Sequence, residues 1–362
     1  MKFNLKKTAQ NLLLLVLSTV IILLVLEWIS RLYFKQAYTH VIDENGAVVS
    51  MQRDAGHPEN GLRPLFKGRL RSGEFDTEII LDSLGFRSPV QSGVELKKAP
   101  LHITLLGDSF MFGWGVELNA SFAGFIAAEL SRRIQRPVFV SNLAIPGTGQ
   151  SSHLKLLKSI PQPTPHIVIS GLYLIDYAAS GNDLTDNLND YFRDNSSRTL
   201  SNNRAEKVGL LRKMRRFLKQ KSNLYRFFET QIGSIFLAKF SGAMNVQRDE
   251  TTMNKAWHIT DSLLVEINNF ALIKDAVLVL QYIPNVFDVS RNNSGVYQKL
   301  ERIAETNKIA IAPNPVEIFH QMNNHFDLNT YYYVVDGHWR EEAHRVCAVA
   351  MANFIIENQL IR

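Results

Sequence analysis

From residue 101 onward, short apolar runs alternate with longer amphipathic segments. The apolar runs have the length of strands and lie at residues 102–106, 137–143, 166–174, 276–280 and 308–312. Apolar residues recur at helical spacing at 121–134, around 154–158, and at 255–272, 295–306 and 341–358. Strands that alternate with helices predict a parallel sheet with right-handed crossovers. We therefore expect a three-layer α/β/α sandwich with a flavodoxin-like sheet over residues 101–362.

The N-terminus has a different pattern, which predicts a transmembrane anchor within residues 1–35. Thr8 to Leu26 contains no charged residue, and a helix of this length spans about 28 Å, close to the thickness of a bilayer's hydrocarbon core. Lysines 2, 6 and 7 precede the run, which favours a cytoplasmic N-terminus and an external remainder. The membrane contact is expected over residues 8–28. A cleaved signal peptide is the alternative, but its apolar region is normally shorter and no small-x-small site follows Leu26.

Two further stretches fit neither pattern. Residues 36–60 are polar and irregular and 61–89 contain short extended pieces, so 36–100 is interpreted as a linker with one small β-ribbon. The insertion at about 184–254 mixes basic and apolar residues, most densely at 204–226. This mixture predicts either a basic amphipathic lid that rests on an anionic membrane surface or a helix that covers the core with an ordinary solvated face.

Composition limits the classes of protein that remain. With 46% hydrophobic residues the chain has ample material for a core, which excludes a disordered protein. The net charge of +6 favours anionic surroundings, such as phospholipid head groups or an acidic polymer, and no feature supports a nucleic-acid partner. The single cysteine, Cys347, excludes a disulfide-stapled fold. Apart from His338 and His344 near the C-terminus, the histidines are scattered along the chain, so we expect neither a metal site nor a cofactor.

The first candidate for chemistry is Ser109. The apolar run that ends at Leu106 stops at Gly107-Asp108-Ser109, which places a hydroxyl at the carboxyl end of a strand. In open α/β sheets, ligands bind at that edge. The serine is either a nucleophile or a turn residue that caps the next helix.

A matching base and acid occur near the C-terminus. Another apolar run breaks into Asp336-Gly337-His338 just before the last helix. A serine hydroxyl is a poor nucleophile until a base takes its proton, and that base needs an acid to fix its tautomer. Asp336 is placed to bond one ring nitrogen of His338 and to leave the other facing Ser109.

Three blocks of residues together resemble the SGNH/GDSL esterase–lipase superfamily. They are Gly107-Asp108-Ser109-Phe110 with the Phe112–Val116 stretch, Asn142 to Gln150, and Asp336-Gly337-His338-Trp339 with Glu342 to Arg345. The approach through Leu81 to Arg87 is similar to that of membrane-anchored bacterial members. The resemblance implies Ser109 as nucleophile, His338 as general base and Asp336 as its orienting acid, while Asp108 belongs to the turn.

The resemblance also implies an oxyanion hole. Its donors would be the backbone N–H groups of Ser109 and Gly147 and an asparagine side chain from a third block. The chain departs from the pattern here, because Ile175-Asp176 follows the third strand and Gly181-Asn182-Asp183 comes later. Either Asn182 folds back into the site or Ile175 occupies the asparagine position.

The last block departs too. Only Gly337 separates Asp336 from His338, where many members have two residues, so Asp336 is either the orienting acid or a simple loop acid. His344 lies on the final helix, where it is expected to cap or pack rather than act as base.

Together these features predict a membrane-anchored serine esterase or O-acyl (acetyl) transferase. It would act on acyl esters, possible substrates being O-acetylated envelope polysaccharides, through a Ser-His-Asp acyl-enzyme mechanism. By resemblance it would sit in a bacterial cytoplasmic membrane as a single-pass protein with a periplasmic or extracellular catalytic domain. The alternative is a non-catalytic glycan-binding or assembly protein that keeps the same fold, an alternative that the irregular third block favours.

Overall fold

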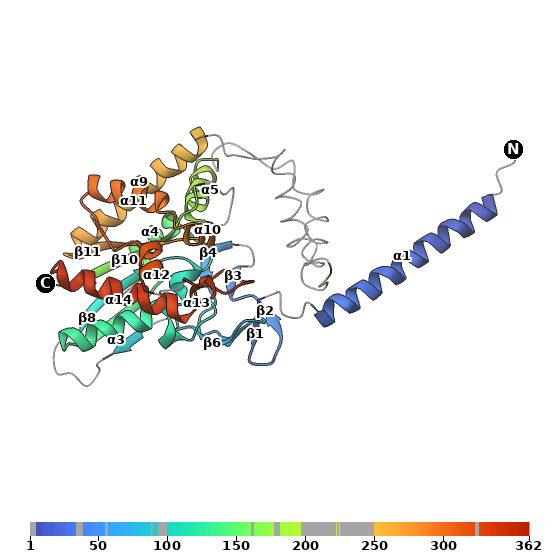
Figure 1. Cartoon of the computed structure of the whole chain (residues 1–362), viewed down its shortest axis with the longest axis horizontal. Helices are drawn as coiled ribbons and strands as arrows, with labels where there is room; N and C mark the ends of the chain where they lie inside the picture. The colour runs from blue at the N-terminus through green and yellow to red at the C-terminus, as the bar shows by residue number, and fades with distance from the viewer. Residues whose placement is uncertain are drawn as a thin grey trace. The chain divides into compact units, whose positions relative to one another are not determined.

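The structure is a computed structural model of the whole chain (Figure 1). It describes residues 5–33, 39–54, 57–87, 90–92, 100–160, 163–176, 182–196, 222, 224, 250–322 and 326–361. Two compact units are present, Met1–Tyr38 with Thr199–Val246 and Thr39–Arg198 with Gln247–Arg362. Apart from 222 and 224, the basic segment 204–226 lies outside the described residues.

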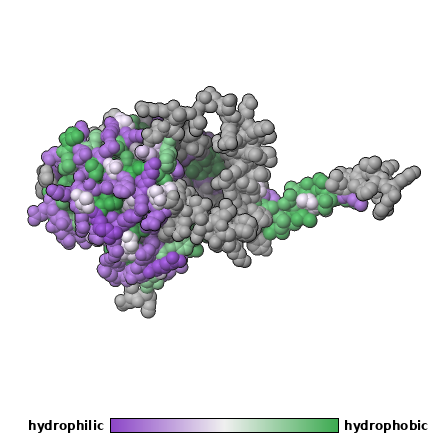
Figure 2. Space-filling model, turned by 90° about the horizontal axis from the view of Figure 1, so that it is seen from above, coloured by the Kyte–Doolittle hydropathy of each residue, from purple (hydrophilic) through white to green (hydrophobic). Residues whose placement is uncertain are grey.

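The first unit contains the long helix α1 (Leu5–Tyr33) of 29 residues. The large apolar side chains between Leu14 and Leu26 are all exposed, and Figure 2 shows mostly green atoms along this part of the helix, with a few pale ones among them. At its C-terminal part the Glu27 carboxylate accepts hydrogen bonds from the Ser222 hydroxyl at 2.7 Å and from the Leu224 backbone N–H at 3.1 Å. Within the described part of the chain, no helix meets the length and hydropathy required of a membrane span.

The second unit is built on a six-stranded sheet. Its strand order is β12-β11-β10-β8-β9-β7. The strands are β7 (Val90–Ser92), β8 (Leu101–Leu106), β9 (Val138–Asn142), β10 (Ile167–Tyr173), β11 (Val277–Ile283) and β12 (Ala310–Ile311). The predicted parallel sheet is confirmed for five of them, in the flavodoxin-like order. The short edge strand β7 was not predicted, and it pairs with β9 in the antiparallel sense.

Helices cover both faces of this sheet, as predicted (Figure 1). On one face α3 (Phe122–Ile134) packs against α14 (Glu341–Glu357), and on the other α4 (Gln150–Ser159) and α5 (Asp183–Ser196) pack against α9 (Glu250–Ile273). The other helical elements of this unit are α2 (Ser109–Phe112), η1 (Leu118–Ala120), α10 (Val286–Ser290), α11 (Gly295–Thr306), α12 (Pro315–Gln321) and α13 (Leu328–Tyr331). Because both faces are covered, the central strand β10 is buried almost throughout and is apolar rather than alternating.

The stretch before residue 100 forms more structure than the sequence indicated. A four-stranded antiparallel sheet, here called the N-terminal sheet, has the order β2-β1-β5-β6. Its strands are β1 (His40–Asp43), β2 (Val48–Val49), β5 (Lys67–Arg71) and β6 (Asp76–Ile80), and β3 (Gln52–Asp54) pairs separately with β4 (His57–Leu62). The prediction of a linker over 36–60 was therefore wrong for its described part, while the predicted ribbon corresponds to β5 and β6. Strand β1 is half-buried at every position, so it lacks the alternation that marks a strand in sequence.

Candidate active site

The predicted nucleophile opens a short helix at the carboxyl edge of the central sheet. Strand β8 ends at Leu106, and α2 begins at Ser109. The Asp108 carboxylate caps this helix by accepting a hydrogen bond from the Phe110 N–H at 2.9 Å. Asp108 thus belongs to the turn, as the resemblance implied, and its cap fixes the direction in which Ser109 leaves the strand.

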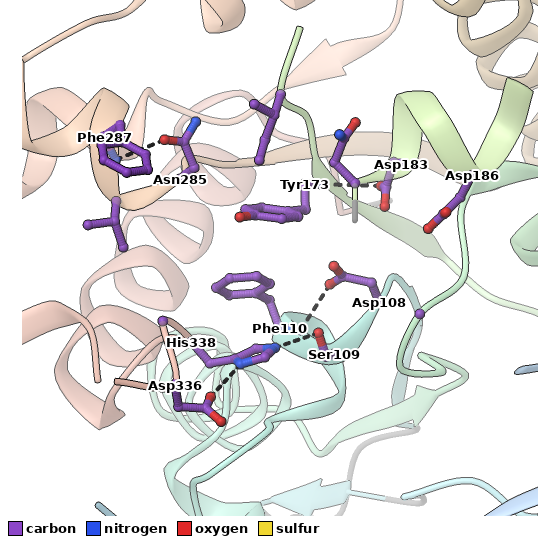
Figure 3. Close-up of a pocket in the computed structure, with 15 residues that line it drawn as sticks. Asp108, Ser109, Phe110, Tyr173, Asp183, Asp186, Asn285, Phe287, Asp336 and His338 are labelled. Carbon is purple, nitrogen blue, oxygen red and sulfur yellow. Dashed lines mark hydrogen bonds and ion pairs between the residues drawn. The ribbon is translucent and has the colours of Figure 1, made fainter. Parts of the chain in front are cut away.

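The structure brings Ser109, His338 and Asp336 together in one hydrogen-bonded chain (Figure 3). His338 Nε2 lies 2.7 Å from Ser109 Oγ, and His338 Nδ1 lies 2.5 Å from Asp336 Oδ1. The single intervening residue, Gly337, has φ +82°, a left-handed conformation that lets the loop turn back so sharply. One residue between Asp336 and His338 is therefore sufficient to bring the carboxylate to the imidazole.

The Asp336 carboxylate sets the tautomer of His338. Because a carboxylate can only accept, Nδ1 carries the proton and Nε2 is left to accept the Ser109 hydroxyl proton. Burial raises the pKa of Asp336, but its hydrogen bonds with His338 and with the Thr39 hydroxyl lower that pKa further, so the net shift is downward. Asp336 thus stays charged beside the imidazole, as an orienting acid must.

The imidazole is also held from its faces by aromatic rings. The ring centroids of Phe110 and Trp114 lie 4.8 and 5.6 Å from that of His338. Packing on these rings limits rotation of the base away from Ser109.

A cavity of about 470 Å³ lies over this chain of residues. Gly147, the predicted backbone donor of the oxyanion hole, and Asn182, the predicted side-chain donor, line this cavity together with Ser109. Asn182 is 2% exposed, and within the described residues its Nδ2 has no hydrogen-bond partner. A buried amide N–H without a partner is costly, so an acceptor in the cavity would stabilise it. Ile175 lines the same cavity, so both residues weighed for the third block reach the site.

The cavity has an acidic side that sequence reasoning missed. Asp183 and Asp186, at the start of α5, line it together with Asp108 (Figure 3). Burial raises the pKa of Asp108 to about 6, and burial together with Asp190 and Asp108 raises that of Asp186 to about 7. Burial, with Asp108 nearby, also raises the pKa of Asp183. The only sequence signal for this acidic side was the spacing of Asp183 and Asp186, the first and fourth residues of the helix. Acidic residues are common in the first turn of helices, so this spacing does not by itself indicate a site.

The opposite rim comes from the loop between β11 and α10, which was also missed. Asn285, Val286 and Phe287 line the cavity there. Asn285 caps α10 by accepting from the Phe287 N–H at 2.8 Å, and the Phe287 side chain is 59% exposed. The cavity is thus apolar and aromatic on this rim and acidic on the other.

The other titratable candidates lie elsewhere. His344 is fully buried on α14, burial lowers its pKa to about 3, and its ring meets that of Trp339 edge-on at 5.5 Å. It packs, as expected, and takes no part in the cavity. A search of the described residues finds no cluster of His, Cys, Asp or Glu that could hold a metal ion.

Comparisons with known proteins return structural likeness only. No family model matches the chain, and no curated protein matches it. Among solved structures, the psychrotrophic esterase EstA from Pseudoalteromonas sp. is 11% identical with a TM-score of 0.40, covering 71% of this chain and 98% of its own. The acetylxylan esterase Axe2 from Geobacillus stearothermophilus is 10% identical with a TM-score of 0.40, covering 70% and 94%. The lipase/acylhydrolase from Enterococcus faecalis is 9% identical with a TM-score of 0.38, covering 71% and 96%.

These proteins are named as esterases and acylhydrolases, the group that the three sequence blocks resemble. At such low identities and TM-scores the likeness carries no information on substrate or activity. Function is therefore inferred below from the geometry of the cavity.

Proposed function

We propose that this chain is a serine esterase that works through an acyl-enzyme. The observation that carries the proposal is the hydrogen-bonded chain from Ser109 through His338 to Asp336 at the floor of a cavity. A buried acid, an imidazole in one tautomer and a hydroxyl in this order form the arrangement that activates serine for attack on a carbonyl.

Each step can be assigned to an atom. Ser109 Oγ attacks the ester carbonyl while its proton passes to His338 Nε2, and the Asp336 carboxylate stabilises the imidazolium that results. The tetrahedral intermediate then collapses, the bond to the alkoxy group breaks, and His338 returns the proton to the leaving alcohol. Water or another hydroxyl group, deprotonated by His338, releases the acyl group from Ser109 in the same way.

The negative charge on the intermediate's oxygen needs donors. The N–H of Ser109 is the first of α2, where a helix has no internal acceptor for it. The Gly147 N–H and the Asn182 Nδ2 group, which has no partner among the described residues, supply the other donors. This proposed use of Asn182 would account for the irregular third block that favoured a non-catalytic binding protein, and it is supported by the position of Asn182 in the cavity lining despite its late place in the sequence.

The acceptor is proposed to be a hydroxyl-rich compound as well as water, which makes the enzyme an O-acetylesterase or acetyltransferase of envelope polysaccharide. Asp186 and Asn285 support this, because carboxylate and amide groups at the cavity are suited to bonding sugar hydroxyls. The ratio of free acetate to acetylated sugar, measured with an O-acetylated oligosaccharide as donor and excess sugar as acceptor, distinguishes the two activities.

We also propose that α1 anchors the protein in the cytoplasmic membrane with its catalytic unit outside. The uncharged run Thr8 to Leu26 and its exposed apolar side chains support an anchor, and the preceding lysines support the orientation. A reporter fused after Gln36 should be active outside the cytoplasm; activity only inside would refute the orientation.

The basic segment 204–226 is proposed as a second membrane contact, so charge reversal at Arg215 and Arg216 should weaken binding to anionic liposomes.

Turnover of p-nitrophenyl acetate by the full chain tests the central proposal. The wild type should hydrolyse the ester and be labelled by a fluorophosphonate, while Ser109→Ala should do neither. Absence of both signals in the folded wild type would contradict the esterase proposal and favour the non-catalytic binding protein.

A further inference from the structure

The loop that carries Asp336 and His338 is exposed in the part that precedes Asp336. The side chains of Val334 and Val335, which precede Asp336, are 70% and 56% exposed. Within the loop, the Gly337 N–H donates to the Tyr333 carbonyl at 3.0 Å and the Tyr333 N–H to the His338 carbonyl at 2.9 Å. These bonds close the turn, but they do not fix its position relative to Ser109.

A carboxylate from the N-terminal sheet provides that fixation. Glu74, in the turn between β5 and β6, accepts three consecutive backbone N–H groups of the loop. The distances are 2.6 Å from Val334, 3.0 Å from Val335 and 2.9 Å from Asp336. Successive N–H groups that converge on one anion form a strong and directional contact, since each bond is charge-assisted.

The residue next to Glu74 extends the contact to the nucleophile's side. The Phe75 ring packs on the Tyr333 ring with centroids 4.8 Å apart, and the Tyr333 hydroxyl donates to the Gly115 carbonyl at 2.8 Å. Gly115 lies in the loop that follows α2, the helix of Ser109. The β5–β6 turn therefore contacts the base loop and, through Tyr333, the nucleophile loop.

The N-terminal sheet also reaches the acid directly. The Thr39 hydroxyl, just before β1, donates to Asp336 Oδ2 at 2.7 Å, while Oδ1 of the same carboxylate accepts from His338. The two bonds fix both oxygens, so the carboxylate cannot rotate without losing one of them.

We infer that the N-terminal sheet is part of the catalytic apparatus, with Glu74 and Thr39 as positioning residues for Asp336 and His338. The inference rests on the proposed esterase function. Neither residue is among those described as lining the cavity, so their removal should impair the chemical step more than substrate binding. Displacements of about an ångström in such a site lower rates by up to about a hundredfold.

Kinetics of full-length variants test this. Glu74→Ala should lower kcat about tenfold or more with KM within twofold, and should slow fluorophosphonate labelling of Ser109 by the same factor. Glu74→Gln keeps an acceptor oxygen and should fall between Glu74→Ala and the wild type. Glu305→Ala, which removes the same charge from an exposed position on α11, outside the N-terminal sheet, is the matched control and should be unchanged.

Thr39 has its own matched pair. Thr39→Val removes the hydroxyl at nearly constant volume and should lower kcat, while Thr39→Ser retains the donor and should restore it. If kcat and labelling of the folded Glu74→Ala protein stay within twofold of the wild type, the contact is merely structural and the inference is overturned, even when thermal stability falls.

A second readout separates this result from failure of the esterase proposal. The proton between His338 Nδ1 and Asp336 should give a far-downfield NMR signal whether or not the protein turns over esters. The signal should persist in Glu74→Gln and broaden or vanish in Glu74→Ala and Thr39→Val. An unchanged signal in all variants would overturn the inference, whereas a wild type that is not labelled at Ser109 would overturn only the esterase function.

Discussion

At the residue scale, Asn182 combines a structural role with a proposed chemical one. Its Oδ1 accepts the Leu184 N–H at 3.1 Å and so caps α5, while its Nδ2 is buried without a partner among the described residues. One side chain thus starts a helix with its oxygen and offers its nitrogen to the cavity. The two roles can be separated because they use different atoms.

Asn182→Ser is expected to separate them. Serine keeps an oxygen that can cap the helix but removes the amide N–H, so kcat should fall about a hundredfold or more while the thermal unfolding midpoint stays near that of the wild type. Asn182→Ala should lose both activity and stability. An Asn182→Ser enzyme with near-normal kcat would instead assign the oxyanion position to another group.

The carboxyl of Asp186 makes stability depend on pH. Its pKa is about 7 in the folded chain, against about 3.9 for an unfolded aspartate. A raised pKa favours the folded state at low pH, and this contribution is lost as pH rises from about 4 through 7. Asp186→Asn removes the titrating group and therefore this loss of stability at high pH. The thermal midpoint of the variant, relative to that of the wild type, should thus be higher at pH 8 than at pH 4.

A variant of an exposed acid, compared with the wild type at the same two pH values, provides the control. Glu44→Gln, on the turn after β1, should show the same difference from the wild type at both pH values. If Asp186→Asn behaves like Glu44→Gln, the burial and the neighbouring Asp190 and Asp108 do not raise the pKa of Asp186 as described.

At the element scale, α2 depends on a buried arginine from outside it. Arg87 is 1% exposed and donates to the carbonyls of Gly113 at 2.7 Å, Val116 at 2.9 Å and Glu78 at 2.9 Å. Burial lowers the pKa of Arg87 to about 10, while Glu117 and Glu78 raise it. One side chain therefore ties the end of the nucleophile helix to strand β6.

Removal of Arg87 should be costly because it leaves several buried carbonyls without donors. Each unsatisfied group costs about 1–3 kcal/mol, so Arg87→Ala should lower the free energy of unfolding in urea by about 3 kcal/mol or more. Arg69 is a control, since its side chain is 45% exposed and pairs with Asp76. Arg69→Ala should cost less than about 1 kcal/mol, and equal costs would contradict the role of Arg87.

The five parallel strands of the central sheet could be predicted because their burial leaves apolar runs in the local sequence. Strand β10 is largely apolar, and α11 was predicted over 295–306, the range found. Ser109 and the Asp336–His338 pair were predictable for a similar reason, since each follows an apolar run. Strands β1 and β2 of the N-terminal sheet were not, because both are short and β1 is half-buried at every position. Thr39 and Glu74 could not be recognised at all, since each acts on residues about 260 to 300 positions away.

At the scale of the whole molecule, all the groups assigned to catalysis belong to one compact unit. Ser109, Asn182, His338 and their positioning residues lie within Thr39–Arg198 and Gln247–Arg362, whereas α1 belongs to the other unit. The proposed anchor should therefore determine where the enzyme acts and on which substrates, but not its intrinsic chemistry.

Removal of residues 1–33 tests whether α1 affects the location of the enzyme without affecting its catalysis. The shortened chain keeps Thr39, so its kcat/KM for p-nitrophenyl acetate should stay within about threefold of the full chain, and its Ser109→Ala form should remain inactive as the control. Burial of a long apolar helix in lipid binds a protein almost irreversibly, so the shortened chain should leave the membrane fraction that retains the full chain. A large loss of kcat/KM in a folded, soluble product would mean that α1 contributes to the active site itself. Retention in the membrane fraction would shift the attachment to the basic segment 204–226, and charge reversal at Arg215 and Arg216 in the shortened chain should then release it.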